Sequence, residues 1–340
     1  MNRRITCFAM VLLVSCSPIQ APSPVSSAPR ASSFNSAERK KTIEQLGDAL
    51  IAMYFDPATG VRYASALRAN LKQGSYDHLL DQKAFADKVK ADLQAVAPDA
   101  HLRLLPNEVF EHGPEPEGPA TPGLPEGIEA MRMMGQVAYL RFTAFPHDPR
   151  TAPAARDFLM ANAGKAKAVI IDARALPGGG IEVMDAMLPL FFSERTVLAR
   201  LETRVAGDKE SPFPDGPTLI RRAGRSGYIT RDHIVTPDTS ETRLRGVPLY
   251  YLTSAATASA GEHLALVLKR KKRATLIGEK TRGAGHYVAL APVGSRLTAL
   301  VPVGRSFDPD TDWDWEGKGV TPDIPVPADA ALDEALKRIG

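Results

Sequence analysis

Hydrophobic positions recur at two different spacings along the chain, and the change of spacing divides it. Apolar side chains such as Ile43, Leu46 and Leu50 repeat at about 3.6 residues per turn, which predicts amphipathic helices. The pattern restarts after Asp56-Pro57 and after Asp81, which are typical signals for the start of a helix. We therefore expect a small bundle of helices over residues 35–105.

From residue 129 onward, short runs rich in β-branched and aromatic side chains replace the helical spacing. These runs begin at Val137, Ala168, Leu249 and Ala274. Helical stretches separate them, near 151–163, 180–193 and 259–272. Strands that alternate with helices are typical of an α/β domain with a largely parallel core sheet. We expect this core over residues 129–330, followed by a C-terminal helix or tail at 331–340.

Two polar segments interrupt these patterns. Residues 106–128 are rich in Pro, Gly and Glu, which indicates a linker between the helices and the core. Residues 204–245 are polar with scattered Gly, Pro and Asp, and we expect them to leave the sheet and cover a cleft.

The first residues are predicted to direct export rather than to fold. Basic residues precede a short apolar run, which is typical of a signal peptide over residues 1–15. The run ends in Leu13-Val14-Ser15-Cys16, which resembles the lipobox of bacterial lipoproteins; ordinary cleavage nearby, after Ala21, is the alternative. Residues 16–34 are rich in Pro, Ser and Ala, which predicts a tether. The resemblance implies that Cys16 is lipidated and anchors the protein in the cell envelope, at the outer membrane facing the periplasm.

Composition excludes several classes of function. The chain carries 42 Lys+Arg against 39 Asp+Glu, which excludes a protein that binds nucleic acid through bulk positive charge. Its two cysteines, Cys7 and Cys16, exclude a disulfide scaffold and a zinc–cysteine site. A phosphate-binding loop ends in a lysine followed by a serine or threonine, and Gly178-Gly179-Gly180 is not followed by these residues, so nucleotide binding is not expected. We expect no cofactor and no metal ion.

The candidate nucleophile is Ser259, which lies between a strand run and a helical stretch. Small residues surround it in Thr257-Ala258-Ser259-Ala260-Gly261-Glu262, so that a substrate backbone could approach closely. The start of a helix offers unpaired N–H groups and a positive dipole, which stabilise a developing oxyanion. A serine that only caps the helix is the alternative.

Five strings together resemble the serine peptidases of family 41. They are Asp99-Ala100-His101-Leu102, Ile171-Asp172-Ala173-Arg174 with the glycine loop, Thr257–Glu262, Gly278-Glu279-Lys280-Thr281, and Trp315–Asp323. This family includes the C-terminal processing (tail-specific) peptidases and the tricorn protease core, and the chain looks most like its interphotoreceptor retinoid-binding-protein-like branch. The resemblance implies a ClpP/crotonase-like α/β core that comes after a helical domain. A PDZ domain does not fit between His101 and Val137.

The resemblance also implies the roles of single residues in a Ser/His/Glu site. Ser259 would be the nucleophile, His101 the general base, and Glu316 the acid that orients the imidazole. The position of the family's lysine base falls on Ala284, so a Ser/Lys mechanism is not expected. His286 lies on the same side of a strand as Ala284 and is the secondary candidate for the base.

Two further features of the site are implied by the resemblance. The backbone N–H groups of Gly178 or Gly179, together with that of Ala260, would form the oxyanion hole. In the tricorn core a serine precedes the histidine and connects it with the glutamate, and here that place is Ala100. A water, or a direct contact with Glu316, would have to replace this link.

Two hypotheses for the function remain. The first is a cell-envelope serine peptidase that hydrolyses peptides or proteins through an acyl-enzyme on Ser259. The alternative is a catalytically weak or inactive binding protein of the same fold, which holds apolar ligands or peptides. An esterase on another scaffold is disfavoured, because no Gly-x-Ser-x-Gly string surrounds Ser259.

Overall fold

The structure, a computed structural model, describes residues 34–111 and 123–340. Residues 34–340 form one compact unit. The predicted signal peptide, Cys16 and nearly all of the tether lie outside the described residues, as does the middle of the segment predicted as a linker. In the described ranges, no helix has the length and apolar character needed to cross a membrane.

Three helices begin the described chain, as the apolar spacing predicts. They are α1 (Ser36–Met53), α2 (Pro57–Lys72) and α3 (Gln82–Val96). Each begins after a polar side chain that accepts a hydrogen bond from the first turn, namely Asn35, Asp56 or Asp81. The apolar faces of the three helices are buried against one another and against the rest of the core. The short α4 (Glu108–Glu111) comes next.

A core sheet contains the strands that the sequence predicts. Its order is β12 (Ile324–Pro325), β9 (Thr275–Gly278), β8 (Leu249–Thr253), β4 (Ala168–Asp172), β3 (Val137–Phe142) and β2 (Ile128–Met134). All neighbouring pairs are parallel except β2 with β3. The prediction of a largely parallel sheet is therefore confirmed.

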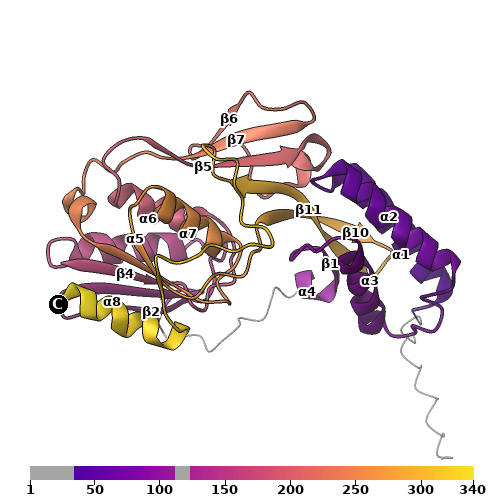
Figure 1. Ribbon diagram of the computed structural model, residues 1–340, viewed down its shortest axis with the longest axis horizontal. Coiled ribbons are helices and arrows are strands. Elements are labelled where there is room, and N and C mark those ends of the chain that lie inside the picture. Colours follow the sequence, from indigo (N-terminus) through magenta and orange to yellow (C-terminus); the bar gives the residue numbers. More distant parts are fainter. Residues whose placement is uncertain (1–33, 112–122) are drawn as a thin grey trace, which may run out of the picture. The chain divides into compact units, whose positions relative to one another are not determined.

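Both faces of the core sheet are apolar, because helices cover both. Val137 and Tyr139 face α8 (Ala331–Ile339), whereas Ala138 and Leu140 belong to the main hydrophobic cluster on the other face. That cluster includes buried side chains of α5 (Thr151–Asn162), α6 (Glu182–Met187) and α7 (Ala260–Arg270). Figure 1 shows α8 and α7 on either side of the sheet.

A second, antiparallel sheet corrects one expectation. Its path is β1 (Arg103–Pro106), β11 (Leu297–Phe307), β5 (Thr196–Arg204), β7 (Tyr228–Val235) and β6 (Leu219–Arg222), and β10 (His286–Val293) also pairs with β11. Residues 204–245, predicted as an excursion from the sheet, therefore contain two strands of a sheet. The segment is polar because β6 is mostly exposed and carries two arginines, while Arg231 and Asp232 of β7 are buried in ion pairs.

Short 3₁₀ helices join these elements. They are η1 (Leu188–Leu190), η2 (Val205–Glu210), η3 (Arg243–Gly246) and η4 (Ala328–Ala330).

The second sheet connects the N-terminal helices with the core. Strand β1 comes soon after α3 and pairs with β11, so that Arg103 lies opposite Leu300. Helix α1 packs against β10 and β11, and Figure 1 shows these elements side by side. As a result, the residues after α3 and the start of β10 meet near the start of α7, where Ser259 lies.

Candidate active site

Ser259 lies at the N-terminus of α7 in a strained backbone conformation. Its φ of 50° and ψ of −116° fall in a region that side chains with a Cβ rarely adopt. Such a conformation costs about 1–3 kcal/mol and persists mostly where function requires it. The turn presents a serine between a strand and a helix, as in the nucleophile elbow of hydrolases, although the Gly-x-Ser-x-Gly string is missing.

The glycine loop after β4 lies directly against this serine. A Cβ added to Gly178 would stand 2.8 Å from Ser259 Cβ, 3.3 Å from Ser259 Oγ and 3.3 Å from Ala260 N. Phe145 clamps the loop, since it donates to Gly178 O and accepts from Gly180 N. The N–H groups of Gly178, Gly179 and Ala260 donate no hydrogen bond within the described part of the chain. Gly179 and Ala260 also line one pocket with Ser259, so these N–H groups are candidates for binding an oxyanion there.

A buried carboxylate, Glu262, holds the start of α7 to the segment 281–284. Its two oxygens accept from Thr281 Oγ1 at 2.6 Å, Gly283 N at 2.6 Å, Ala284 N at 2.8 Å and Ser259 N at 3.0 Å. Burial raises the pKa of Glu262, whereas these four hydrogen bonds oppose that change. This carboxylate thus fixes the backbone of Ser259 relative to Ala284.

His286 shares a small pocket with Ser259. Its Nδ1 lies 2.8 Å from Asp99 Oδ2, which also accepts a hydrogen bond from Tyr54 at 2.8 Å. Burial lowers the pKa of His286, but the hydrogen bond and the charge of Asp99 outweigh it, so that the pKa lies above its ordinary value. Burial likewise raises the pKa of Asp99, and its hydrogen bonds with His286 and Tyr54 outweigh that effect.

His101 lines a second cavity, which meets the first at Ala284. Ala258 and Ala284 also line this cavity, and Ala284 lines both. The Nδ1 atom of His101 is buried and has no hydrogen-bond partner among residues 34–111 and 123–340. Burial lowers the pKa of His101 to about 4, so its imidazole is neutral at neutral pH. No hydrogen bond joins Ser259 Oγ to either histidine in the described ranges.

Glu316 accepts hydrogen bonds from the backbone next to His101 and from the backbone of His286. Its Oε1 accepts from Ala100 N at 3.2 Å, and its Oε2 accepts from His286 N at 3.0 Å. Oε2 also lies 3.9 Å from His286 Nδ1. Glu316 therefore connects the backbone before His101 with the backbone of β10.

Three of these groups also have the spacing of metal ligands. One ligand atom each from Asp99, His286 and Glu316 lie within 4.8 Å of one another. Each carboxylate oxygen in the group already accepts hydrogen bonds from backbone or side-chain donors. An ion would have to displace the His286–Asp99 hydrogen bond, so the chemistry of this donor set favours a hydrogen-bonded histidine.

A chain of two histidines ends beside the serine pocket. His263 Nε2 lies 2.9 Å from His233 Nδ1, and His233 Nε2 lies 2.7 Å from Asp185 Oδ1. His263 lines the same pocket as Ser259, and its ring packs edge-on against Trp315. The sequence placed His263 one turn after Ser259 but offered no sign that His233 would contact it.

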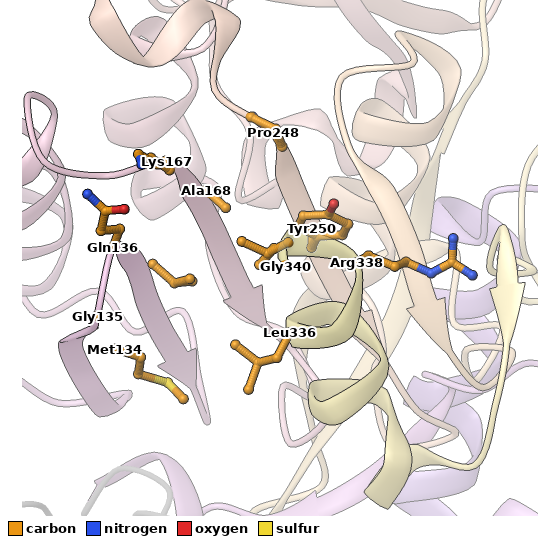
Figure 2. Close-up of a pocket in the computed structure, with 12 residues that line it drawn as sticks. Met134, Gly135, Gln136, Lys167, Ala168, Pro248, Tyr250, Leu336, Arg338 and Gly340 are labelled. Carbon is orange, nitrogen blue, oxygen red and sulfur yellow. The ribbon is translucent and has the colours of Figure 1, made fainter.

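A cavity of about 680 Å³ lies at the opposite edge of the core sheet from the carboxyl ends of its parallel strands. Strand ends and α8 line it, including Val137, Ala168, Tyr250 and Leu336 (Figure 2). Figure 2 shows Lys167 and Arg338 at its margin. It contains no pair of groups suited to acid–base chemistry, so the smaller cavities beside Ser259 form the candidate site.

The sequence gave no sign of several contacts in this region. The structure brings Ser259, the glycine loop, His101, His286 and Glu316 into one region. The contact of Asp99 with His286 had no signal, because 187 positions separate the two residues. The four hydrogen bonds of Glu262 could not be predicted either, because its position in a helical stretch gave no sign of them.

Comparisons with known proteins agree on one family. The model of peptidase family S41 matches residues 136–326. The model of the N-terminal domain of that family in eukaryotic IRBP matches residues 34–139.

Two individual relatives each match only part of this chain. The chloroplastic carboxyl-terminal-processing peptidase 2 of Arabidopsis thaliana is 36% identical over 130 residues, which cover 36% of this chain and 25% of the relative. The carboxy-terminal-processing protease of Bartonella bacilliformis is 26% identical over 205 residues, which cover 57% of this chain and 40% of the relative. The chain thus spans less than half the length of each.

A solved structure supports the fold over most of the chain. The photosystem II D1 C-terminal processing protease matches with a TM-score of 0.56 at 16% identity, over 86% of this chain and 94% of that one. At this identity the likeness concerns the fold, namely N-terminal helices before an α/β core.

Proposed function

The chain belongs to peptidase family S41, and on that premise we propose that it is a cell-envelope peptidase that cuts protein substrates through an acyl-enzyme on Ser259. One observation carries the proposal. Ser259 adopts a strained backbone at a helix start, Gly178 packs directly against it, and Gly179 and Ala260 line one pocket with it. A serine that only caps a helix requires neither the strain nor the facing loop.

In the proposed reaction, Ser259 Oγ attacks the carbonyl carbon of the peptide bond while a histidine takes its proton. The N–H groups of the glycine loop and Ala260 stabilise the negative charge on the carbonyl oxygen. The same histidine then gives the proton to the leaving amine, and the C–N bond breaks to leave an ester on Ser259. Water, deprotonated by the histidine, hydrolyses this ester and restores the serine.

We propose His101 as this base, with Glu316 as the acid that orients it. The resemblance assigns these roles, and burial supports it because a neutral imidazole has the free lone pair that a base needs. His286 is the second candidate, and a specific observation favours it. It shares the pocket with Ser259 and already has a carboxylate partner in Asp99.

The envelope location rests on the proposed lipidation of Cys16. It has a direct test in metabolic labelling with a lipid precursor. We expect label and membrane association in the wild type and neither in Cys16→Ser. A variant that remains membrane-bound and labelled would contradict the lipobox.

A fluorophosphonate probe tests the central proposal, because it reacts only with an activated serine. We expect the wild type to be labelled and Ser259→Ala not to be. A matched control is Ser254→Ala, since Ser254 comes directly after β8 and its hydroxyl donates to Arg174 O. A folded wild type that takes no label would favour the alternative, a binding protein of the same fold.

A further inference from the structure

The pocket that contains Ser259 has room for one small group. Its volume is about 20 Å³, which is enough for a group the size of a water molecule. Gly179 and Ala260 line it together with Ser259, so the proposed nucleophile and two proposed oxyanion donors share this space. The residue that supplies the attacked carbonyl would place its side chain here, because that side chain is attached to the carbon next to the carbonyl.

Two polar atoms at this pocket have no partner in the fold. His263 and Ser306 line the pocket, and both residues are buried. Within the described residues, His263 bonds through Nε2 and not through Nδ1, and the hydroxyl of Ser306 makes no hydrogen bond. Neither His263 Nδ1 nor Ser306 Oγ is fully enclosed by protein, so the small accessible part of each residue includes that atom. A group in the pocket can therefore reach both atoms.

Neighbouring polar side chains in the pocket wall are satisfied within the fold. The hydroxyl of Tyr287 lies 2.8 Å from Thr203 Oγ1. The indole Nε1 of Trp315 donates to Ala284 O at 3.0 Å. The two unpartnered atoms differ from these neighbours, because the protein supplies no group to bond them.

The fold also determines which hydrogen-bonding role His263 Nδ1 has. An ionised carboxylate only accepts, so His233 Nε2 carries the hydrogen in its 2.7 Å contact with Asp185. With His233 neutral, its Nδ1 is an acceptor, and His263 Nε2 donates to it across 2.9 Å. Burial lowers the pKa of His263 well below its ordinary value, so this ring is neutral as well. His263 Nδ1 is left with a lone pair and accepts a hydrogen bond from a group in the pocket.

A hydroxyl is the group that satisfies both atoms. It donates its hydrogen to His263 Nδ1 and accepts one from Ser306 Oγ, and it is about the size of a water molecule. A methyl group of the same size would leave both atoms without a bond. Among the ordinary side chains, serine carries a hydroxyl on the smallest stem, so it fits this pocket in both size and chemistry.

We propose that this pocket is a subsite for serine, as the residue whose carbonyl Ser259 attacks, and that His263 and Ser306 determine this specificity. The inference rests on the proposed function, because the nucleophile identifies the residue that enters the pocket. A site built to bond a hydroxyl discriminates against analogues that lack it, because its own polar groups then stay unpaired.

The test uses three peptides that differ only at the residue before the cleaved bond. This residue is serine, alanine or 2-aminobutyrate, which replaces the serine hydroxyl with a methyl group of similar size. We measure kcat/KM for each peptide with the wild type, Ser306→Ala and His263→Gln. Glutamine keeps a polar atom near the position of Nε2, which bonds His233, but places none at the position of Nδ1. The control is His78→Gln, at an exposed position outside the pocket.

We expect the wild type to cleave the serine peptide about 10- to 100-fold better than the 2-aminobutyrate peptide. His263→Gln should reduce this ratio to about one, Ser306→Ala should reduce it about threefold or more, and the control should keep it. If His263→Gln does not fold, Ser306→Ala alone decides. Equal cleavage of the three peptides by the wild type would overturn the subsite and indicate a pocket that holds only water. A ratio that stays unchanged in every folded pocket variant would overturn it as well.

Binding of the same peptides to Ser259→Ala separates this inference from the proposed function. If the fluorophosphonate probe finds no activated serine, the peptidase proposal fails. The subsite then stands only if Ser259→Ala binds the serine peptide more tightly than the 2-aminobutyrate peptide and loses that preference when Ser306→Ala is added. Equal binding of the three peptides would overturn it regardless of turnover.

Discussion

The two cavities that meet at Ala284 differ in whether the histidine side chains that line them are hydrogen-bonded. On the side of Ser259, His286 bonds Asp99 and His263 bonds His233. On the side of His101, Nδ1 of the imidazole is buried and has no hydrogen-bond partner within the described residues. Folding alone therefore gives the two histidines of the first cavity their partners, whereas His101 Nδ1 needs a ligand or a water.

This contrast bears on which of the two histidines is the base. The fold holds His286 in place through Asp99 whether or not substrate is present, so its fixed position alone does not identify it as the base. An unsatisfied buried nitrogen costs about 1–3 kcal/mol, and a substrate or a water that bonds His101 Nδ1 would remove this cost. Four substitutions and pH measurements can test whether the two cavities differ in this way.

Removal of the proposed base should have the largest effect. We expect His101→Ala to lower kcat/KM for peptide hydrolysis by about 10²- to 10⁴-fold, because a positioned base contributes about that much. His286→Ala should reduce activity less, through the loss of the Asp99 contact. If His286→Ala abolishes turnover while His101→Ala retains it, the base is His286, in the pocket that contains Ser259.

Glu262→Gln should destabilise the contact between the start of α7 and residues 281–284, beside the pocket of Ser259. The substitution keeps the shape of the side chain but turns an NH₂ group toward two of the four donors, which then lack an acceptor. We expect the free energy of unfolding to fall by about 2–4 kcal/mol, measured with denaturant. Glu194→Gln, at an exposed position, is the control and should change little. Equal stability of the two variants would show that the four bonds contribute nothing net.

The acid limb of the pH profile should distinguish the two bases. A base works only when neutral, so kcat/KM falls as pH drops through its pKa in the free enzyme. Burial lowers the pKa of His101 to about 4, so activity should persist well below pH 6.5, the ordinary value for histidine. Asp99 raises the pKa of His286, so activity that depends on a His286 base would already fall at a pH above 6.5. The measurement is kcat/KM between pH 4 and 8 on folded protein.

Ala100→Ser should have the smallest effect, and it should be a gain. A hydroxyl before His101 can supply the hydrogen bond that its Nδ1 lacks and can also reach Glu316, which already contacts Ala100 N. One such bond contributes about 0.5–1.5 kcal/mol, so we expect kcat to rise about two- to tenfold. Ala100→Cys, close to serine in shape but with only a weak hydrogen-bonding group, is the control. A rise in both variants would exclude the hydrogen bond as the cause.

Local signals predicted the helices and the core sheet, because caps and spacing act within a few residues. Asn35 and Asp81 cap their helices as expected, and the runs from Val137 to Ala274 form strands of one sheet. The antiparallel sheet was missed at residues 204–245, because buried ion pairs make β7 polar where a core strand is usually apolar. A propensity argument cannot distinguish such a strand from a loop.

The site residues were predictable only as members of known strings. Ser259 and His101 were visible in this way, and their catalytic roles stay predictions. The contact of Asp99 with His286 and that of His263 with His233 depend on tertiary packing. The sequence within a few positions of these residues gives no sign of either contact.

Glu316 accepts a hydrogen bond from Ala100 across 216 positions of sequence, and this long reach has a consequence for folding. Contacts between distant positions form late, since a large loop must close before they contribute. An unfinished fold therefore has neither the base nor the nucleophile in place, and partial unfolding separates them early. If the chain cuts polypeptides as proposed, this order would protect newly made copies from one another until each has closed its own loop.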